Sequence, residues 1–490
     1  MGTDIARPFN RSPRVARAVP KAPVTEAKLR VRVNAAVAVG LWVMLWAGYN
    51  TNLWYIEQPN FPDSAMNLVH GLRAFVPLLA AWLALLIMTA RMGRLGEWIL
   101  SPIGLLLFYA VVALASSALV SVEPGDAIYW GGMYFSIIAG LLAIVPVENP
   151  LPDLRQVMNF NWIVDSLLTL SLLGALPFLG RHAMTDVEGS PVSVRAYGTG
   201  YNDEGVLGMA STRNTGFARY AAIAGLVALA RIWDGKPRKR LMWSVMLLAS
   251  LYALVLSNGR TEVLAFIASA SLVLFPMKRK RTVLILVGVG GAALLGVVGF
   301  YNKFFKYITR TGHMDTNMLT LSGRTHTWEE GWKLFVQSPW WGFGFQADRY
   351  YLHQHMHNAF LHVFVQAGVL GGGAILLALI AVWLLTLKHF FFRPPRDRVL
   401  IPPEIPGVLL FVTISSVTES TFAYYSAAWL LCAPIFAYVL ALDRQQRKVQ
   451  TIAARERYRS LLLKRRPRTA GPSSRANEAP SPPGQNLQHS

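Results

Sequence analysis

The 490-residue chain contains one cysteine, Cys432, and few charged residues. A single cysteine excludes a disulfide framework and any multi-cysteine zinc or iron–sulfur site. Charged residues make up 15% of the chain, against about 25% in an ordinary soluble domain, whereas hydrophobic residues make up 53%. There is no Walker loop or dinucleotide fingerprint, because Gly342-Phe343-Gly344 is too short to form one. The polar first thirty residues also predict that no cleavable signal peptide is present. These absences argue against soluble enzyme domains and favour a polytopic membrane protein.

Apolar segments recur along the chain, and a membrane span needs about 20 such residues. We therefore predict an all-α integral membrane protein with about twelve transmembrane helices. The segment 358–387 is longer than one crossing needs, so we expect it to tilt or to project from the bilayer. The predicted spans are 33–54, 69–90, 98–120, 127–147, 160–180, 217–233, 241–257, 261–277, 282–300, 358–387, 405–420 and 424–442.

The chain has 47 Lys and Arg against 26 Asp and Glu, and most of the basic residues fall in alternate loops. The short loops 55–68 and 121–126 on the opposite side contain acids and no Lys or Arg. The positive-inside rule therefore places both termini in the cytoplasm. We predict a basic, disordered tail over 1–32, a polytopic catalytic domain over 33–442 and a second basic, mostly disordered tail over 443–490. The tails would attract anionic membrane lipid rather than nucleic acid.

Two segments on the outer side, 181–216 and 301–357, are long enough to build a site. The second predicts an amphipathic helix that begins near Arg324 and ends near Pro339. Its aromatic residues are expected to lie against the bilayer surface or the helix bundle, with an interfacial position preferred over sugar stacking. These residues are Trp328, Trp332, Phe335, Trp340 and Trp341.

Polar residues stand directly before three spans that enter the membrane from outside. Arg213 precedes the sixth span, Arg260 the eighth, and His357-Asn358 the tenth. A helix N-terminus carries unpaired N–H groups and a partial positive charge, so with two arginines it favours an anion such as phosphate. The alternative for each arginine is an interfacial anchor for the helix end.

Four histidines lie close together before and inside the tenth predicted span. Alternating histidines could ligate a metal, but this stretch runs into a helix and has no carboxylate cluster beside it apart from Asp348. A histidine at the mouth of a membrane helix, near two arginines, better fits a general base for a hydroxyl nucleophile. A hydrogen-bonded interfacial histidine is the remaining alternative. The four are His353, His355, His357 and His362.

These motifs resemble the O-antigen ligase and O-antigen polymerase superfamily. His357-Asn358, nine residues, Gly368, two residues and Gly371 are similar to its His-Asn-x9-Gly-x-x-Gly signature, which here is extended by two further glycines. These glycines are expected to serve close helix packing and to allow the span to bend. The segment that starts at Arg260 resembles the Arg-x3-Leu motif, and the segment that starts at Arg213 resembles an arginine–glycine element.

The resemblance implies a GT-C-like glycosyltransferase that takes a glycan from undecaprenyl diphosphate at the periplasmic face of the bacterial inner membrane. His357 would be the base, while Arg213 and Arg260 would bind the diphosphate. Asn358, Arg324 and Glu419 would support them. The implied transfer inverts the anomeric carbon and uses no cofactor and no metal.

Ligase and polymerase share this signature. We favour a ligase that passes O-antigen to a hydroxyl of lipid A–core, because basic residues suited to a phosphorylated acceptor lie in the second outer segment. They are Lys303, Lys306 and Arg310. One chain carries every motif, so a monomer suffices. A glycolipid transporter is the other class, but it would place polar residues near the midplane and repeat its halves.

Overall fold

In the computed structural model, the described residues are 24–48, 63–91, 95–179, 214–234, 237–257, 259–275, 324–391 and 401–465. They form helices, turns and bends, with no strand among them. The helices are α1 Val24–Ala47, α2 Asp63–Thr89, α3 Gly96–Ile99, α4 Pro102–Leu119, α5 Pro124–Ile144, α6 Leu151–Leu179, α8 Asn214–Asp234, α9 Pro237–Leu256, α10 Arg260–Leu274, α14 Arg324–Gln337, α15 Ala347–Tyr351, α16 Ala359–Phe390, α17 Glu404–Ser415 and α18 Ala427–Arg465.

The predicted spans correspond to helices wherever the structure describes them. Six helices are long and apolar enough to cross a membrane, and four shorter apolar helices accompany them. The predicted span 282–300 lies outside the described residues, as do parts of the outer segments 181–216 and 301–357. The protein is thus a helical membrane protein that crosses the bilayer several times, while the predicted number of twelve spans stays a prediction.

The chain divides into two units, the first ending at Leu442 and the second beginning at Asp443. Helix α18 runs through this boundary to Arg465, well beyond the end of the last predicted span. In the second unit, the side chains from Lys448 to Ser460 are exposed. The predicted disordered tails 1–32 and 443–490 lie only partly within the described residues, and their described parts, 24–32 and 443–465, are helical.

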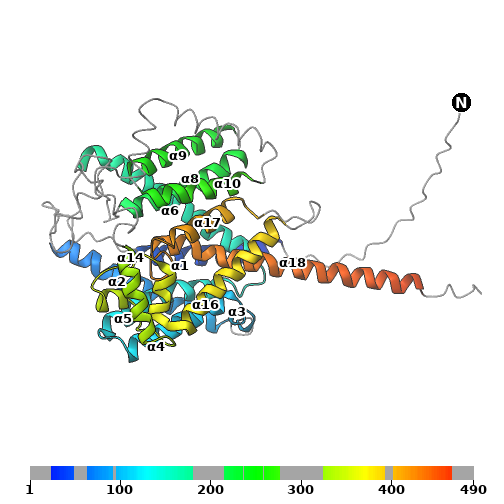
Figure 1. Cartoon of the computed structure of the whole chain (residues 1–490). Helices are drawn as coiled ribbons and strands as arrows, with labels where there is room; N and C mark the ends of the chain where they lie inside the picture. Colours follow the sequence, from blue (N-terminus) through cyan, green and yellow to red (C-terminus); the bar gives the residue numbers. More distant parts are fainter. Residues whose placement is uncertain are drawn as a thin grey trace, which may run out of the picture. The chain divides into compact units, whose positions relative to one another are not determined.

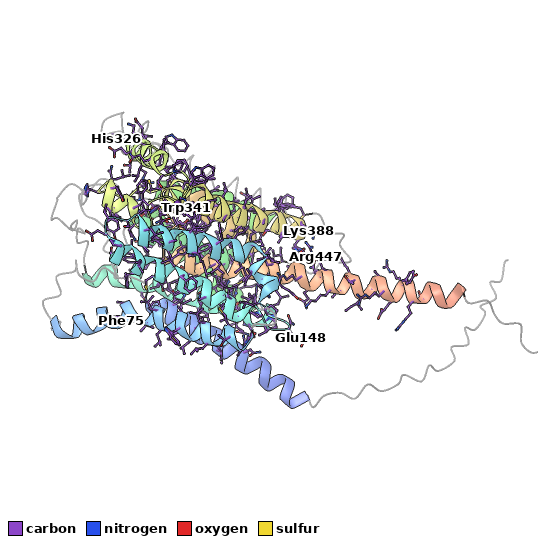
Figure 2. All side chains as sticks on the ribbon, turned by 90° about the horizontal axis from the view of Figure 1, so that it is seen from below. Phe75, Glu148, His326, Trp341, Lys388 and Arg447 are labelled. Carbon is purple, nitrogen blue, oxygen red and sulfur yellow. The ribbon has the colours of Figure 1, made fainter. Side chains whose placement is uncertain are left out.

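Within the first unit, helices distant in sequence pack side by side. Helix α4 packs against α5 and α16, and α10 packs against α8 and α17. Figure 1 shows α8, α9 and α10 as neighbouring green ribbons. Side chains fill the spaces between the helices (Figure 2), and three of the largest, Trp42, Trp162 and Trp429, are fully buried. Burying apolar surface of this size drives close packing of the bundle.

A buried amide joins three of these helices. The Nε1–H of Trp46 on α1 donates to Oδ1 of Asn161 on α6 over 2.8 Å. The amide of Asn161 in turn donates to the carbonyl of Leu430 on α18 over 2.9 Å. A polar group inside an apolar bundle is stabilising only when it is hydrogen-bonded, and Asn161 meets that condition.

Helix α16 is broken at Gly368, which has φ 58° and ψ −163° inside an otherwise helical segment. This conformation is open to glycine and strained for other residues. The segment after α14 packs against α16 at this break. The N–H of Val369 donates to the carbonyl of Pro339, and the N–H groups of Phe343 and Gly344 donate to carbonyls of α16. The expected bend is thus present, and it fixes the segment that leads from α14 to the histidines.

Candidate active site

His357 and Glu419 form the centre of the candidate site. His357 precedes α16 and has a left-handed backbone, with φ 49°. Its Nδ1 lies 3.3 Å from Oε2 of Glu419, which follows the end of α17 at Ser415. The N–H of Ala359 donates to the carbonyl of Ser416 over 2.8 Å, so the start of α16 is joined to the end of α17. The two helix ends therefore bring together side chains that are 62 residues apart.

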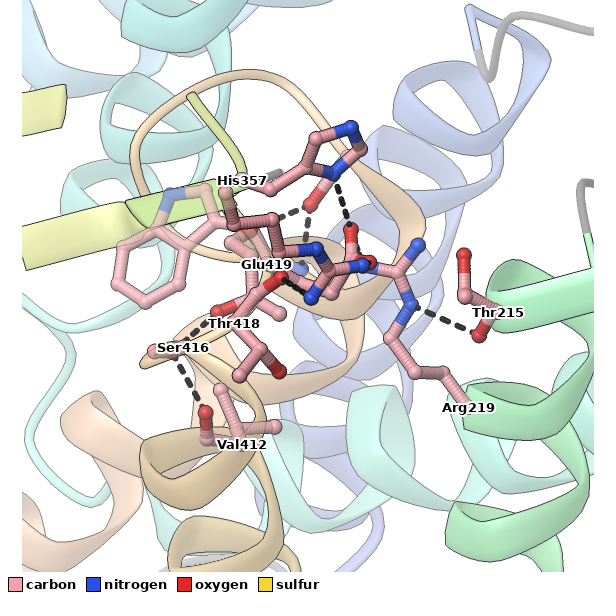
Figure 3. A network of polar contacts seen from close by, with 11 residues as sticks. Thr215, Arg219, His357, Val412, Ser416, Thr418 and Glu419 are labelled. Carbon is pink, nitrogen blue, oxygen red and sulfur yellow. Dashed lines mark hydrogen bonds and ion pairs between the residues drawn. The ribbon is translucent and has the colours of Figure 1, made fainter. Parts of the chain in front are cut away.

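Two arginines contact the same carboxylate (Figure 3). Nη2 of Arg324 lies 3.1 Å from Oε1 of Glu419, and Nη1 of Arg324 donates to the carbonyl of Thr418 over 2.6 Å. Nη1 of Arg219 lies 3.7 Å from Oε2 of Glu419, and its Nε donates to the carbonyl of Thr215. Arg324 opens α14 and Arg219 lies in the second turn of α8, so elements from three parts of the chain meet at one anion.

The electrostatics of Glu419 follow from this arrangement. The residue is only 3% exposed, and burial opposes its ionisation. The positive charge of Arg219, the hydrogen bond from His357 and the charge of Arg324 outweigh burial and hold the pKa of Glu419 well below its ordinary value. The carboxylate is therefore ionised at neutral pH and can orient His357 by accepting the proton on Nδ1.

The residues predicted from sequence have different outcomes in the structure. His357, Arg324 and Glu419 are brought together. Asn358 caps α16, where its side chain accepts a hydrogen bond from the N–H of Leu361 over 3.0 Å. It therefore fixes the backbone that follows His357.

The structure does not describe the side chains of the two arginines that are predicted to bind diphosphate. Arg213 lies outside the described residues, as do Lys303, Lys306 and Arg310. Arg260 forms the first residue of α10, and its side chain is not among those described. Their contribution to the site stays a prediction.

Sequence reasoning missed two members of this cluster. Arg219 falls inside an apolar run, where it resembles an anchor at the edge of a span. Glu262 lies in the first turn of α10 and is 2% exposed, close enough to interact electrostatically with Arg219 and Glu419. The sequence did contain a signal for both residues, since each is a charged residue inside a predicted membrane span. Such a residue is costly unless it is paired or functional.

A second polar cluster lies beside the first. Nδ1 of His355 is 2.9 Å from Oδ2 of Asp348, and Nε2 of His362 is 3.1 Å from Oδ1. The rings of His355 and His357 are 4.4 Å apart. Sequence analysis found no carboxylate cluster beside these histidines apart from Asp348, and the structure places Asp348, on α15, in contact with two of them. Among the described residues, these three are the group whose atoms could hold a metal ion.

Burial and mutual contact set the protonation of this second cluster. Burial lowers the pKa of His355 to about 3, against the opposing influence of Asp348. His355 is thus neutral at neutral pH, which leaves a lone pair on one of its ring nitrogens.

The predicted amphipathic helix is α14, and its aromatic residues do not share one environment. Nε1 of Trp328 donates to the carbonyl of Met356 over 2.8 Å, which holds the chain just before His357. Phe335 is buried, whereas Trp332 is 57% exposed. Trp340 and Trp341 are also exposed, as expected for an interfacial belt. Only part of the aromatic set therefore faces outward.

Fold and site together define a multi-pass helical membrane protein with a histidine–carboxylate pair and two arginines near helix N-termini. Residues 245–376 match the sequence model of the O-antigen ligase family, here Wzy_C. Through this segment, about a quarter of its length, the chain is similar to the O-antigen ligase family. The match contains Arg260, Arg324 and His357, whereas Arg219 and Glu419 lie outside it.

The chain is also similar to the exopolysaccharide production protein ExoQ of Rhizobium meliloti strain 1021. The two sequences are 26% identical over 211 residues. The alignment covers 38% of this chain and 47% of the relative, about half of that protein's length. Both similarities are to proteins that are named for O-antigen ligation or for polysaccharide production.

Proposed function

We propose that the protein is an O-antigen ligase, which transfers O-antigen from undecaprenyl diphosphate to a sugar hydroxyl of lipid A–core. The observation that supports this most strongly is the His357–Glu419 pair, held by Arg324 and Arg219 beside the start of α16. A base next to a cluster of positive charge suits a reaction in which a hydroxyl attacks and an anionic diphosphate leaves.

In the proposed reaction, His357 acts as the general base. With Glu419 accepting the proton on Nδ1, Nε2 presents the lone pair that takes the proton from the acceptor hydroxyl. The hydroxyl oxygen forms its bond to the anomeric carbon while the bond from that carbon to the diphosphate oxygen breaks. The diphosphate leaves with the electron pair. A single displacement of this kind inverts the anomeric carbon, and no step needs a metal ion or cofactor.

The arginines would stabilise the negative charge that develops on the leaving diphosphate. Arg213 and Arg260 carry this role by resemblance. Arg260 is the first residue of α10, and Arg213 comes before α8 in the sequence, so the partial positive charge of each helix N-terminus would add to theirs. Arg219 and Arg324 would support the same field, because two guanidinium groups face one carboxylate at Glu419. A planar guanidinium suits phosphate oxygens, since it can donate two parallel hydrogen bonds.

We place this site at the periplasmic face of the bacterial inner membrane. The distribution of Lys and Arg supports an arrangement with both termini in the cytoplasm. In that arrangement, 33–442 is the catalytic domain, with its outer segments 181–216 and 301–357, and 1–32 and 443–490 are basic cytoplasmic tails. One chain carries all proposed site residues, so the enzyme would act as a monomer.

A polymerase that extends lipid-linked glycan is the second candidate. The similarity to a protein named for exopolysaccharide production favours it, since a polymerase lengthens chains that stay on the lipid carrier. Both reactions would use the same base and the same leaving group. They differ in whether the attacking hydroxyl belongs to lipid A–core or to another lipid-linked unit.

Reconstitution separates the two candidates. The full chain is incorporated into liposomes with undecaprenyl-diphosphate-linked glycan, with and without purified lipid A–core, and the products are resolved by mass. Glycan-capped lipid A supports the ligase. Longer lipid-linked chains without a lipid A product would replace it with the polymerase, and neither product would overturn both.

A further inference from the structure

Asp348, His355 and His362 form a compact group distinct from the residues assigned to transfer. Their ligand atoms all lie within 4.8 Å of one another. The side chains of Asp348 and His362 are 0% and 1% exposed, and that of His355 is 10% exposed. The group contains two imidazoles and one carboxylate, the donor types that zinc-class divalent cations take in proteins.

The hydrogen bonds of Tyr109 and Gln366 determine whether Nε2 of His362, the atom nearest Asp348, carries a proton or a lone pair. The hydroxyl of Tyr109 donates to Oε1 of Gln366, so the amide NH2 of Gln366 faces Nε2 of His362 at 2.9 Å. An amide NH2 only donates, and His362 Nε2 therefore accepts and carries a lone pair.

The lone pair on His362 Nε2 lies next to a second electron-pair donor, an oxygen of Asp348. His362 Nε2 lies 3.1 Å from Oδ1 of Asp348, and this buried oxygen has no hydrogen-bond partner in the part of the chain that the structure describes. Two electron-pair donors at this distance repel each other unless a cation is shared between them. The arrangement is that of two ligands of one ion.

We propose that Asp348, His355 and His362 bind one divalent cation of the zinc class. Zinc takes nitrogen and carboxylate oxygen at about 2.0–2.2 Å, which sets tetrahedral ligand atoms about 3.3 Å apart. The observed separations of 2.9 Å and 3.1 Å need only a small adjustment. Water completes the coordination.

The ion has a structural role. Its ligands come from α15, from the connecting loop and from α16, so one ion joins three consecutive parts of the chain. Within this loop, His353 and His357 have left-handed backbones, and the N–H of Met356 donates to Oδ2 of Asp348 over 3.2 Å. The ion holds the loop without taking part in the transfer reaction, so the proposal stands independently of that reaction.

Metal content of the full chain tests the site. The protein is purified in detergent without chelator from zinc-supplemented cells, and zinc is measured by inductively coupled plasma mass spectrometry. We expect about one zinc per chain. Asp348→Asn and His362→Gln, which preserve side-chain size, should each reduce zinc content at least about tenfold after dialysis, because each removes a ligand. His326→Gln is the matched control, since His326 is an exposed histidine of α14 paired with Glu330.

The competing arrangement places a proton between His362 and Asp348, with the Gln366 amide turned round, and predicts no bound metal. The proposal would be overturned if wild-type protein contained no zinc and its melting temperature did not rise when zinc was added. Equal zinc in wild type and in both variants would also overturn it, because binding would then be adventitious.

Cobalt provides a measurement that does not depend on the variants folding. Wild-type protein is stripped with a chelator and titrated with Co²⁺. The proposal expects visible absorption bands of a nitrogen–oxygen site, which reach a plateau at about one ion per chain and disappear when Zn²⁺ is added. Their absence would contradict the site.

Discussion

Nδ1 of His357 lies 3.3 Å from Oε2 of Glu419, and Arg219 and Arg324 contact the same carboxylate. The carboxylate thus has two functions in the proposed reaction. It fixes which nitrogen of His357 carries the proton, and it balances two positive charges that would otherwise stand together in a buried site.

Replacing Glu419 by Gln should lower the transfer rate about 10- to 100-fold. Glutamine retains the size of the side chain but loses the charge that orients His357. The rate is measured in liposomes with lipid-linked glycan and acceptor. Glu329→Gln is the control, because Glu329 is an exposed acid paired with Lys333 and should leave the rate unchanged. A wild-type rate in Glu419→Gln would remove the carboxylate from the mechanism.

Stability of the same variant should depend on pH. The folded-state pKa of Glu419 is lowered, so its ionisation stabilises the fold fully above the unfolded-state pKa of about 4.3 and less as pH falls below that value. The difference in melting temperature between wild type and Glu419→Gln should therefore shrink between about pH 5 and pH 3. Thermal unfolding in detergent measures it, and a difference that grows on acidification contradicts the lowered pKa.

Arg219→Gln should reduce transfer at least about tenfold, because it removes one of the positive charges near the leaving group. Since Arg219 contacts Glu419, the double variant Arg219→Gln/Glu419→Gln should lose less than the product of the two single losses. Arg349→Gln is the control on an exposed arginine. Independent, multiplying effects would show that the two residues are not coupled.

Gly368→Ala should destabilise the protein by about 2–4 kcal/mol. A Cβ at this position would lie 2.2 Å from the carbonyl of Trp340, and the backbone has a positive φ. Gly373→Ala in the same helix is the matched control, since its Cβ would meet nothing within 4 Å and the change should stay within about 1 kcal/mol of neutral. Chemical unfolding measures both, and equal stabilities would contradict the account of the helix break.

Sequence predicted the helices well because hydropathy and charge are local signals. A motif before a predicted span pointed to His357, because polar residues are conspicuous beside apolar runs, and Arg324 was named as the start of the predicted amphipathic helix and as a supporting residue. The pairings could not be predicted in the same way. Glu419 was named as support for His357, but the contact between them spans 62 residues and depends on tertiary packing rather than on a local signal.

Arg219 and the grouping of Asp348 with two histidines both depend on tertiary packing. Arg219 lies inside the predicted span 217–233, and only the packing of α8 near α17 brings it to Glu419. Asp348 and His362 lie on different helices, α15 and α16, and a loop separates them in the sequence. Asp348 nevertheless contacts His362, because the segment 339–344 packs against the break at Gly368 and α15 follows that segment. Such a contact depends on tertiary packing rather than on sequence spacing.

The most direct test of the proposed base is the transfer rate of His357→Ala in liposomes that contain lipid-linked glycan and lipid A–core. Loss of the general base should slow transfer about 10²- to 10⁴-fold while the protein accumulates normally in the membrane. His326→Ala, an exposed histidine on α14, should transfer at the wild-type rate. Transfer by His357→Ala at the wild-type rate would contradict the mechanism.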